Sequence, residues 1–416
     1  MKILFIHQNF PAQFLHLAAD LARDPAMQVV ALGLHGGAAT PGVATPGVAT
    51  PGVTTPGVTL RRYQLLRAAG ADTHPLLAEQ ETHVRYAEAC AACAMQLQRD
   101  GFTPDVIYAH PGWGEALFIK DVFPHARLLI YCEYYYALEG QDVGFDPSLP
   151  PLSLPERWRL RLRNSTNLLS MELADAALSP THWQRSTYPA WAQDKISVIH
   201  DGVDSERLRF NPAARLALPL AQGAMRTFQP GDEVVSYVAR HLEPMRGFQV
   251  FMRALPDLLQ RRPQAHVIVA GGEAGGYGHA APGGASWKQH MLAEVGDHID
   301  LARVHFTGQL APAQYLDLLS ISRMHAYWSV PFVLSWSFLE AALSGLPVIA
   351  SATAPVLEFA ARLDVHTVPF FDAAAFADAL AERCAAGPQD PRQPRHLPDT
   401  DLAQCLARQR QWLGAS

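Results

Sequence analysis

Short apolar runs alternate with amphipathic segments along the N-terminal half of the chain. The apolar residues 2–6 predict a strand, and after a polar stretch residues 14–21 carry apolar side chains at the spacing of one helix face. Three more strands are predicted by the apolar runs at residues 29–34, 105–109 and 128–132. Alternating strands and helices predict a parallel sheet, whose ligands bind beyond the carboxyl ends of its strands.

The C-terminal half repeats this alternation after a turn-rich boundary. A predicted strand and turn at residues 195–204 lead into a passage rich in proline, alanine and glycine that extends to Gly231. Strands are then predicted at residues 234–239, 266–270, 303–306, 325–328 and 347–350, and helices at residues 248–261, 312–321 and 336–344. The pattern therefore predicts two α/β domains, one on each side of this boundary.

The length of the chain agrees with two domains. Its 416 residues are too many for one ordinary core and suffice for two domains of roughly 150–200 residues. Nearly half of the residues are hydrophobic and 17% are charged, which is typical of globular proteins. We expect an N-terminal domain at residues 1–205, a second domain at residues 206–386, and a tail at residues 387–416 with a helix at 402–413.

A five-residue unit that begins Thr-Pro-Gly-Val occurs four times in residues 40–59. Each copy brings a proline without an N–H and a flexible glycine, so the tract favours neither a helix nor a central strand. We expect a surface loop there.

Composition limits the classes of binding partner and the cellular compartments that we expect for the protein. A formal charge of −6 gives no electrostatic reason to expect a nucleic-acid partner. No apolar run reaches the roughly 18 residues of a membrane span, and the N-terminal run is too short for a signal peptide. The five cysteines are scattered, and the pair Cys90 and Cys93 has no second pair at zinc-ligand spacing. These features predict a cytoplasmic protein with reduced thiols and no integral membrane segment, and they leave peripheral membrane contact open.

The most informative segment covers residues 329–351, where a loop enters a predicted helix and a strand follows. The first N–H groups of that helix, near Leu334 and Ser335, lack backbone partners and form an anion site suited to a diphosphate. Glu340 lies about one turn further along, where its carboxylate can accept hydrogen bonds from a ribose. The alternative is an ordinary loop that leads into a core helix.

Two arginines follow the first predicted strand of the second domain. Arg240 and Arg246 lie between that strand and the helix at residues 248–261. Guanidinium groups are costly to leave unpaired and are well shaped for two-point contacts with phosphate. We therefore expect a phosphate site there, with surface salt bridges as the alternative.

The segment 329–351 resembles the signature of family 4 glycosyltransferases, a Glu-x7-Glu loop and helix followed by a glycine, a proline and a strand. This resemblance implies the GT-B fold, with two Rossmann-like domains facing a cleft. Glu340 takes the place of the second glutamate, which in the family holds the donor ribose, whereas Phe332 stands where the first glutamate binds sugar hydroxyls. Ser335 stands where the family has a glycine. Arg246 stands where it has a lysine, with one extra residue in between.

The resemblance also assigns donor-site positions on shorter motifs. Gly308 and Leu310 match a loop that lies against the nucleotide base through its backbone. Glu358 matches a glutamate in a later loop. Both motifs belong to the predicted second domain, so the resemblance implies that this domain binds the donor.

In the first domain the resemblance points to residues that follow three predicted strands. Asn9 and Gln13 lie where the family places its acceptor-facing loop, although this loop lacks the usual glycines, and helix capping by Asn9 is the alternative. His110 lies where the family also has a histidine. Glu133 replaces a family histidine near the reacting carbon. Its carboxylate can orient the acceptor hydroxyl, stabilise positive charge at the anomeric carbon, or pair with an arginine.

The resemblance implies a glycosyltransferase, as in polysaccharide biosynthesis, that moves a sugar from a nucleoside diphosphate to a hydroxyl of a glycan, lipid or small molecule. It implies retention of configuration at the anomeric carbon and a final helix that crosses back onto the first domain. No Asp-x-Asp pair or histidine spacing predicts a metal, so helix amides and arginines are expected to stabilise the leaving diphosphate without a cofactor. The alternatives are a sugar-nucleotide epimerase of GT-B shape and, because of Phe332, a non-catalytic nucleotide-sugar-binding protein.

Overall fold

The computed structural model describes residues 1–35, 55–65, 67, 69–147, 150–219, 223–273, 276, 281–387 and 392–415. These residues form two compact units. The first comprises the described residues up to Gly202 together with those from Leu402 onward, and the second comprises Val203–Asp401. The first unit thus ends three residues before the boundary expected after residue 205, and residues 392–401 of the expected tail belong to the second unit. Most of the repeat tract, residues 40–54, lies outside the described residues.

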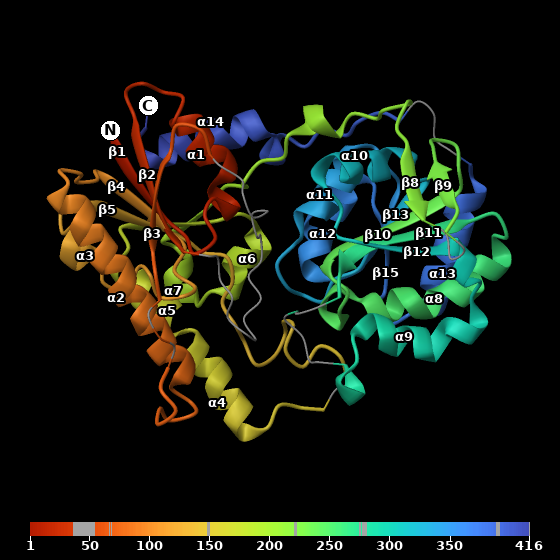
Figure 1. Ribbon diagram of the computed structural model, residues 1–416, viewed down its shortest axis with the longest axis horizontal. Helices are drawn as coiled ribbons and strands as arrows, with labels where there is room; N and C mark the ends of the chain where they lie inside the picture. The colour runs from red at the N-terminus through yellow and green to blue at the C-terminus, as the bar shows by residue number, and fades with distance from the viewer. Residues whose placement is uncertain are drawn as a thin grey trace. The chain divides into compact units, whose positions relative to one another are not determined.

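The described residues of the first unit contain a seven-stranded sheet in which all neighbouring strands are parallel (Figure 1). Its order is β3-β2-β1-β4-β5-β6-β7. The strands are β1 (Lys2–Ile6), β2 (Gln28–Leu34), β3 (Thr59–Tyr63), β4 (Val106–Ala109), β5 (Arg127–Tyr131), β6 (Ala176–Ser179) and β7 (Ile196–Val198). The order reverses direction between β1 and β4, and in parallel sheets such a reversal is where ligands bind.

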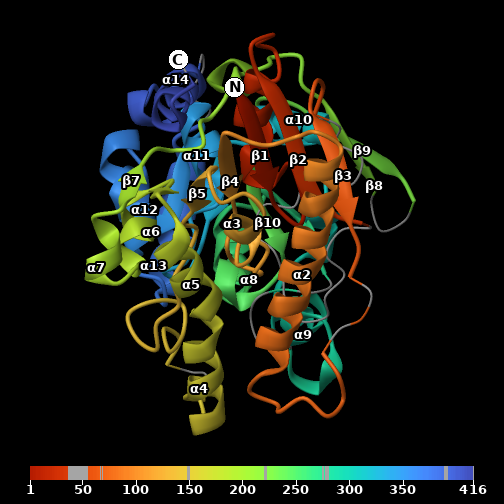
Figure 2. The ribbon, with the colours of Figure 1, turned by 90° about the vertical axis from the view of Figure 1, so that its left-hand side faces the viewer.

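Helices cover this sheet and include the C-terminal one (Figure 2). They are α1 (Leu15–Leu21), α2 (Ala78–Arg99), α3 (Ile119–Val122), α4 (Leu154–Arg163), α5 (Ser165–Leu173), α6 (His182–Thr187), α7 (Ala190–Gln193) and α14 (Leu402–Leu413). Arg410 of α14 forms ion pairs with Asp20 and Asp24 at the end of α1, with N–O distances of 3.1 and 2.8 Å. Trp412 packs its ring 5.4 Å from that of Tyr108 on β4. The last helix therefore completes the core of the first unit.

The described residues of the second unit contain a six-stranded parallel sheet of order β12-β11-β10-β13-β14-β15. Its strands are β10 (Val234–His241), β11 (His266–Gly272), β12 (Val304–Gly308), β13 (Met324–Tyr327), β14 (Val348–Ser351) and β15 (His366–Val368). The flanking helices are α8 (Phe248–Arg261), α9 (Trp287–Val295), α10 (Pro312–Ile321), α11 (Trp336–Leu343), α12 (Ala354–Ala360) and α13 (Ala373–Ala385). The order reverses between β10 and β13, so the loops after these two strands meet at the ligand-binding edge.

The passage before Gly231 that is rich in proline, alanine and glycine contains secondary structure. Strands β8 (Leu216–Pro219) and β9 (Met225–Phe228) pair antiparallel. Leu216 and Leu218 are buried while the residues between and after them are exposed, which is the alternation of a strand with one covered face. No strand was predicted here, because proline and alanine, which are poor strand formers, obscured this alternation.

No helix among the described residues combines the length and the apolar character needed to cross a membrane.

Gly247 makes the turn between β10 and α8 possible. Its φ is +62°, and a Cβ atom there would lie 2.2 Å from Cδ1 of Trp328. Replacement by alanine is expected to lower the free energy of unfolding by about 3 kcal/mol, because left-handed strain adds to overpacking against a buried indole. Urea denaturation measures this loss.

Gly387 provides the matched control for Gly247. It has a φ of +78°, and none of the described residues lies within 4 Å of the added Cβ atom. Gly387→Ala should therefore cost only the backbone strain, about 1 kcal/mol. Equal losses in the two variants would show that contact with Trp328 contributes nothing.

Candidate functional site

Two loops converge where the second sheet reverses direction. β10 and β13 are adjacent, with Val235 beside Met324 and Tyr237 beside Ala326. The first loop carries Arg246 after β10, and the second, residues 328–335, follows β13 and enters α11. The backbone N–H of Val330 in the second loop donates to the carbonyl oxygen of Met245 in the first at 3.0 Å. The two segments that the sequence singled out separately are therefore one hydrogen-bonded structure.

Arg246 is fixed against the loop that precedes α11. Its Nη1 donates to Ser329 Oγ and to the carbonyl oxygen of Val333, each at 3.0 Å. Its guanidinium carbon lies 5.7 Å from the centre of the buried Phe332 ring. Within the described part of the chain, Nε and Nη2 of Arg246 form no hydrogen bond. A positioned guanidinium thus retains donors that can bind a phosphate.

The start of α11 offers fewer amides than the sequence suggested. Ser335 is the N-cap residue, and its N–H already donates to the hydroxyl of Tyr327 at 3.0 Å. The expectation that this amide is open for an anion is therefore wrong. The N–H groups of Leu334 and Ser337 form no hydrogen bond with any described residue, so these two remain for a ligand.

Glu340 lies in the middle of α11 and is half-buried. Its Oε2 accepts a 2.9 Å hydrogen bond from the hydroxyl of Tyr315 on α10. Burial raises the pKa of Glu340, while the Tyr315 hydrogen bond and the charge of Arg207 lower it in part. The carboxylate therefore has a fixed orientation and one bound hydroxyl donor, with the remaining acceptor positions available to others.

The other predicted donor-site residues lie on separate elements. β10 extends two residues further than predicted, so Arg240 falls within the strand, where its register with β11 shifts. Gly308 ends β12 with a φ of +68°. The side chain of Leu310 packs against the apolar cluster beside β8 and β9, and Glu358 is half-buried on α12. In the described part of the chain, no hydrogen bond or ion pair between these residues and Arg246 or Glu340 is found.

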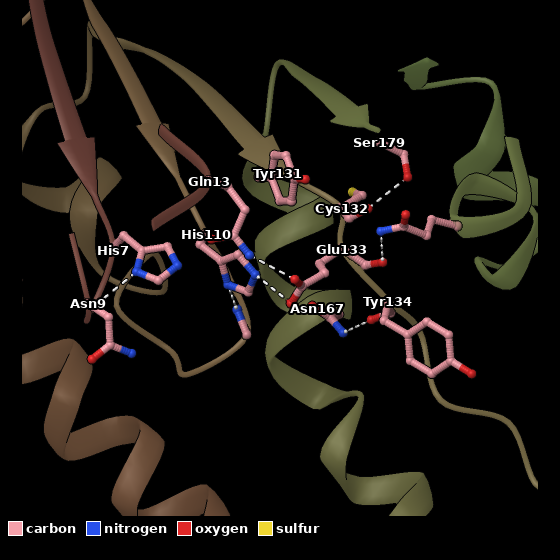
Figure 3. Close-up of polar contacts among 12 residues, drawn as sticks. His7, Asn9, Gln13, His110, Tyr131, Cys132, Glu133, Tyr134, Asn167 and Ser179 are labelled. Atoms are coloured by element: carbon pink, nitrogen blue, oxygen red, sulfur yellow. Dashed lines mark hydrogen bonds and ion pairs between the residues drawn. The ribbon is translucent and has the colours of Figure 1, made fainter. Parts of the chain in front are cut away.

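In the first unit, three polar side chains meet beyond the ends of β1, β4 and β5 (Figure 3). His110 Nε2 lies 3.3 Å from Glu133 Oε2, and Gln13 Nε2 donates to Glu133 Oε1 at 2.7 Å. Glu133, His110 and Gln13 are 8%, 4% and 8% exposed. The structure thus brings together three of the four predicted residues of this unit. Gln13, which was expected to face the acceptor, donates to Glu133 in the folded chain.

Local contacts determine which nitrogen of His110 carries the proton. The N–H of Gly112 donates to His110 Nδ1 at 3.2 Å, so a neutral ring has its proton on Nε2, directed at Glu133. The ring stacks on Trp113 at 4.4 Å between centroids, and Tyr131 packs 5.9 Å from it. These contacts hold the imidazole in place beside the Glu133 carboxylate.

His7 is a buried neighbour of this pair that the sequence did not single out as a site residue. Its Nδ1 accepts a 2.9 Å hydrogen bond from the N–H of Asn9, and its ring lies 5.1 Å from that of His110 (Figure 3). Burial, and secondly the charge of His110, hold the pKa of His7 well below its usual value, so the ring is neutral at neutral pH. Its position directly after β1 is the sequence signal that could have identified it as a site residue.

The structure tests one of the two expectations for Asn9, helix capping. Its backbone N–H binds His7, and the N-cap residues of the two helical segments that follow are Pro11 and Phe14. Asn9 caps neither segment, so the capping alternative was wrong.

A second layer of buried polar groups supports this cluster, and no sequence motif marked it. Tyr63 donates to Glu115 at 2.7 Å, and burial raises the pKa of Glu115. The hydroxyl of Tyr131 lies 3.0 Å from both carboxylate oxygens of Asp201. Gln184 Nε2 donates to the carbonyl oxygen of Glu133 at 2.9 Å, which fixes the main chain that carries the carboxylate.

Comparison with known families agrees with this geometry. A sequence model described as "Glycosyl transferase family 4 group" matches residues 42–208, and one described as "Glycosyl transferases group 1" matches residues 232–385. The chain belongs to the family 4, group 1 glycosyltransferases. The first match lies mostly within the first unit and the second lies within the second unit, so both halves of the chain contribute to the assignment.

Curated relatives support the same family. The chain is 32% identical over 207 residues to a D-inositol 3-phosphate glycosyltransferase of Streptomyces coelicolor. The aligned region covers 45% of this chain and 42% of the relative. It is 32% identical over 209 residues to the enzyme of the same name from Saccharomonospora viridis, covering 48% and 44%. The chain therefore spans less than half the length of these relatives.

Solved structures show the GT-B fold. Sucrose-phosphate synthase from Thermosynechococcus elongatus has a TM-score of 0.63 at 16% identity, and all of both chains is covered. An alpha,alpha-trehalose-phosphate synthase from Burkholderia vietnamiensis has a TM-score of 0.63 at 15% identity with the same coverage. The family 4 chain has this fold, with one Rossmann-like domain in each unit.

Phe332 and Glu340, the two positions that the sequence resemblance pairs, lie in one continuous segment. Phe332 is buried in the loop before α11, beneath the Arg246 guanidinium, and Glu340 lies within α11. An apolar ring cannot accept hydrogen bonds from sugar hydroxyls. Phe332 therefore cannot take the role that the resemblance gives to the first glutamate.

Proposed function

We propose that the protein is a glycosyltransferase that transfers a sugar from a nucleoside diphosphate to an acceptor hydroxyl, with retention at the anomeric carbon. The observation that supports this most is Arg246. Its guanidinium is hydrogen-bonded to the loop that enters α11, at the strand ends where the second sheet reverses direction. A preorganised cation beside open helix amides stabilises the negative charge that develops on a leaving diphosphate.

The second unit binds the donor in this proposal. Arg246 and the open amides of Leu334 and Ser337 hold the diphosphate, and the Glu340 carboxylate accepts hydrogen bonds from the ribose. A reaction driven by these groups needs no metal, because a guanidinium and helix amides offset the charge of the departing diphosphate. Activity is therefore expected to persist when a chelator is added.

The first unit positions the acceptor. Glu133 is held by Gln13 and by His110, and its carboxylate is suited to orient a hydroxyl or to stabilise positive charge at the anomeric carbon. Inositol phosphates are the first acceptors to test, because the curated relatives are named for inositol 3-phosphate.

A thermal-shift panel of UDP-, GDP- and ADP-sugars tests the proposal. We expect one class of nucleotide to raise the melting temperature, since a ligand that binds only the folded state stabilises it. NMR of the product formed with the stabilising donor then reports the anomeric configuration. A folded protein that no nucleotide sugar stabilises would contradict the donor site, and an inverted product would contradict retention.

Replacing Glu340 by alanine is expected to weaken donor binding about 100-fold, since two hydrogen bonds to a charged acceptor are lost. The measurement is calorimetric titration with the nucleotide sugar. The corresponding nucleoside monophosphate keeps the ribose and lacks the β-phosphate. Its affinity should fall by a similar factor in the variant. Loss of affinity for the diphosphate compound alone would contradict the ribose role.

Tyr315→Phe tests whether the Tyr315 hydrogen bond controls the pKa of Glu340. The Tyr315 hydrogen bond lowers a pKa that burial raises, so its loss raises the pKa of Glu340 further. Donor binding needs the charged form and is lost as pH falls through that pKa, so the loss should begin at a higher pH in the variant. Tyr135→Phe in the first unit is the control, and an unchanged acid limb in Tyr315→Phe would contradict this role.

A further inference from the structure

α4 and α5 of the first unit display a stripe of mostly apolar side chains, of which four are exposed and two are half-buried. The two helices follow one another end to end, with Asn164 between them (Figures 1 and 2). The stripe consists of Leu154, Trp158, Leu162, Ser165, Leu169 and Leu173. Successive members are four, four, three, four and four residues apart in the sequence. Leu154, Trp158 and Leu169 are 62%, 49% and 51% exposed. Regular helical spacing places these side chains on one face.

The opposite face of these helices is anchored, so the stripe is displayed by a folded element. Leu160 and Met171 are buried. Arg163 Nε donates to Glu79 of α2 at 2.9 Å, and Asn164 Nδ2 donates to the carbonyl oxygen of Tyr136 at 2.8 Å. Two core residues, an ion pair and a hydrogen bond thus hold the pair of helices to the unit.

Arginines flank the stripe on α4. Arg159 and Arg161 are exposed and Arg157 is half-buried. Within the described residues, none of the three forms an ion pair with a carboxylate. The acidic residue among them, Glu156, binds the backbone N–H and hydroxyl of Ser153 in a capping box. The segment therefore combines a tryptophan, leucines and unpaired cations.

We propose that α4 and α5 bind the surface of a membrane that contains anionic lipids. Trp158 and the leucines enter the boundary between headgroups and acyl chains, while Arg157, Arg159 and Arg161 contact lipid phosphates. A tryptophan and leucines on one face with arginines beside them are the composition of helices that lie in a membrane interface. A second copy of the chain is disfavoured as the occupant, because pairing the stripes would bring the arginines of both copies together.

This inference is independent of the proposed transfer reaction. No helix among the described residues spans a membrane, so the contact is peripheral. Its chemical basis is charge complementarity with lipid phosphates together with burial of apolar side chains, and neither involves Arg246 or Glu133.

Vesicle sedimentation of the full chain tests the proposal. Vesicles of phosphatidylcholine mixed with an equal amount of phosphatidylglycerol should bind the protein, and phosphatidylcholine alone should bind it at least about tenfold more weakly. Trp158→Ala with Leu169→Ala, and separately Arg159→Glu with Arg161→Glu, should each weaken binding to the mixed vesicles about tenfold or more. Added salt should weaken binding of the parent chain.

Matched variants control for loss of exposed tryptophan and of positive charge. Trp191, on α7, is 63% exposed, so Trp191→Ala removes a tryptophan outside the stripe. Arg23 and Arg99 are exposed in the same unit, and their double reversal to glutamate matches the change in charge on α4. Both controls should bind the mixed vesicles within about twofold of the parent chain.

Three results would overturn the proposal. They are absence of sedimentation with mixed vesicles, equal weakening by the control and stripe variants, and self-association in size-exclusion chromatography that Trp158→Ala abolishes without any vesicle binding. Nucleotide-sugar binding by the stripe variants should equal that of the parent chain. Failure of membrane binding is therefore distinguishable from failure of the proposed transfer function.

Discussion

Arg246→Ala is expected to lower kcat about 1,000-fold, because a preorganised positive charge at a leaving group contributes several kcal/mol to the transition state. In the folded protein this guanidinium is held by Ser329 and by the carbonyl oxygen of Val333, so in the proposed reaction it needs no reorganisation to contact the diphosphate. The interaction strengthens as negative charge develops on the leaving group. The loss should therefore fall on kcat more than on KM. Steady-state kinetics with the stabilising donor measures both constants.

Two further variants separate charge from structure at this position. Arg246→Lys keeps the charge and should retain activity within roughly tenfold, though with one contact point instead of two. Arg253→Ala removes an arginine of α8 that is paired with Glu294 on the surface, and it should leave kcat unchanged. Full activity in Arg246→Ala, with the variant folded, would contradict a role in departure of the diphosphate.

The regular elements with strong periodicity were predictable from the sequence. Helices at 248–261, 312–321 and 402–413 were predicted with the bounds that the structure shows, because their apolar residues recur at helical spacing. β3 was not predicted. It is an edge strand, four of its five residues are exposed or half-buried, and only Tyr63 is buried, so no alternation appears in its sequence.

In the candidate site, only the residues that directly follow predicted strands could be placed from the sequence. Placing His110 and Glu133 after neighbouring parallel strands was enough to expect them near one another, and their side chains meet at 3.3 Å. The hydrogen bond from Gln13 to Glu133 joins residues 120 positions apart, and the one from the Ser335 amide to the Tyr327 hydroxyl depends on a loop conformation. Tertiary contacts of this kind leave no local pattern in the sequence.

Phe332 illustrates how a departure from a family motif acquires a structural meaning. A phenylalanine in place of a sugar-binding glutamate suggests a lost function when only the sequence is considered. In the folded chain the ring is buried and faces the Arg246 guanidinium, an arrangement that is favourable for a cation over an aromatic face. Phe332 therefore supports the residue proposed to bind the phosphate.

Glu133→Gln is expected to lower kcat about 100- to 1,000-fold while the protein stays folded. Glutamine has the size of glutamate, and its amide can bond to Gln13 and His110 if the Gln13 amide turns over, so the change removes the charge alone. Kinetics with the donor and acceptor gives kcat, and urea denaturation confirms that stability changes little.

Glu133→Ala distinguishes this role from a structural one. It leaves the buried groups of Gln13 and His110 without their partner and should lower the free energy of unfolding by about 2 kcal/mol. If Glu133 acts through its charge, the alanine and glutamine variants should have similarly low kcat values despite their different stabilities. If the carboxylate only supports the fold, activity should follow stability and the glutamine variant should be active. That result would move the proposed acceptor site away from the ends of β4 and β5.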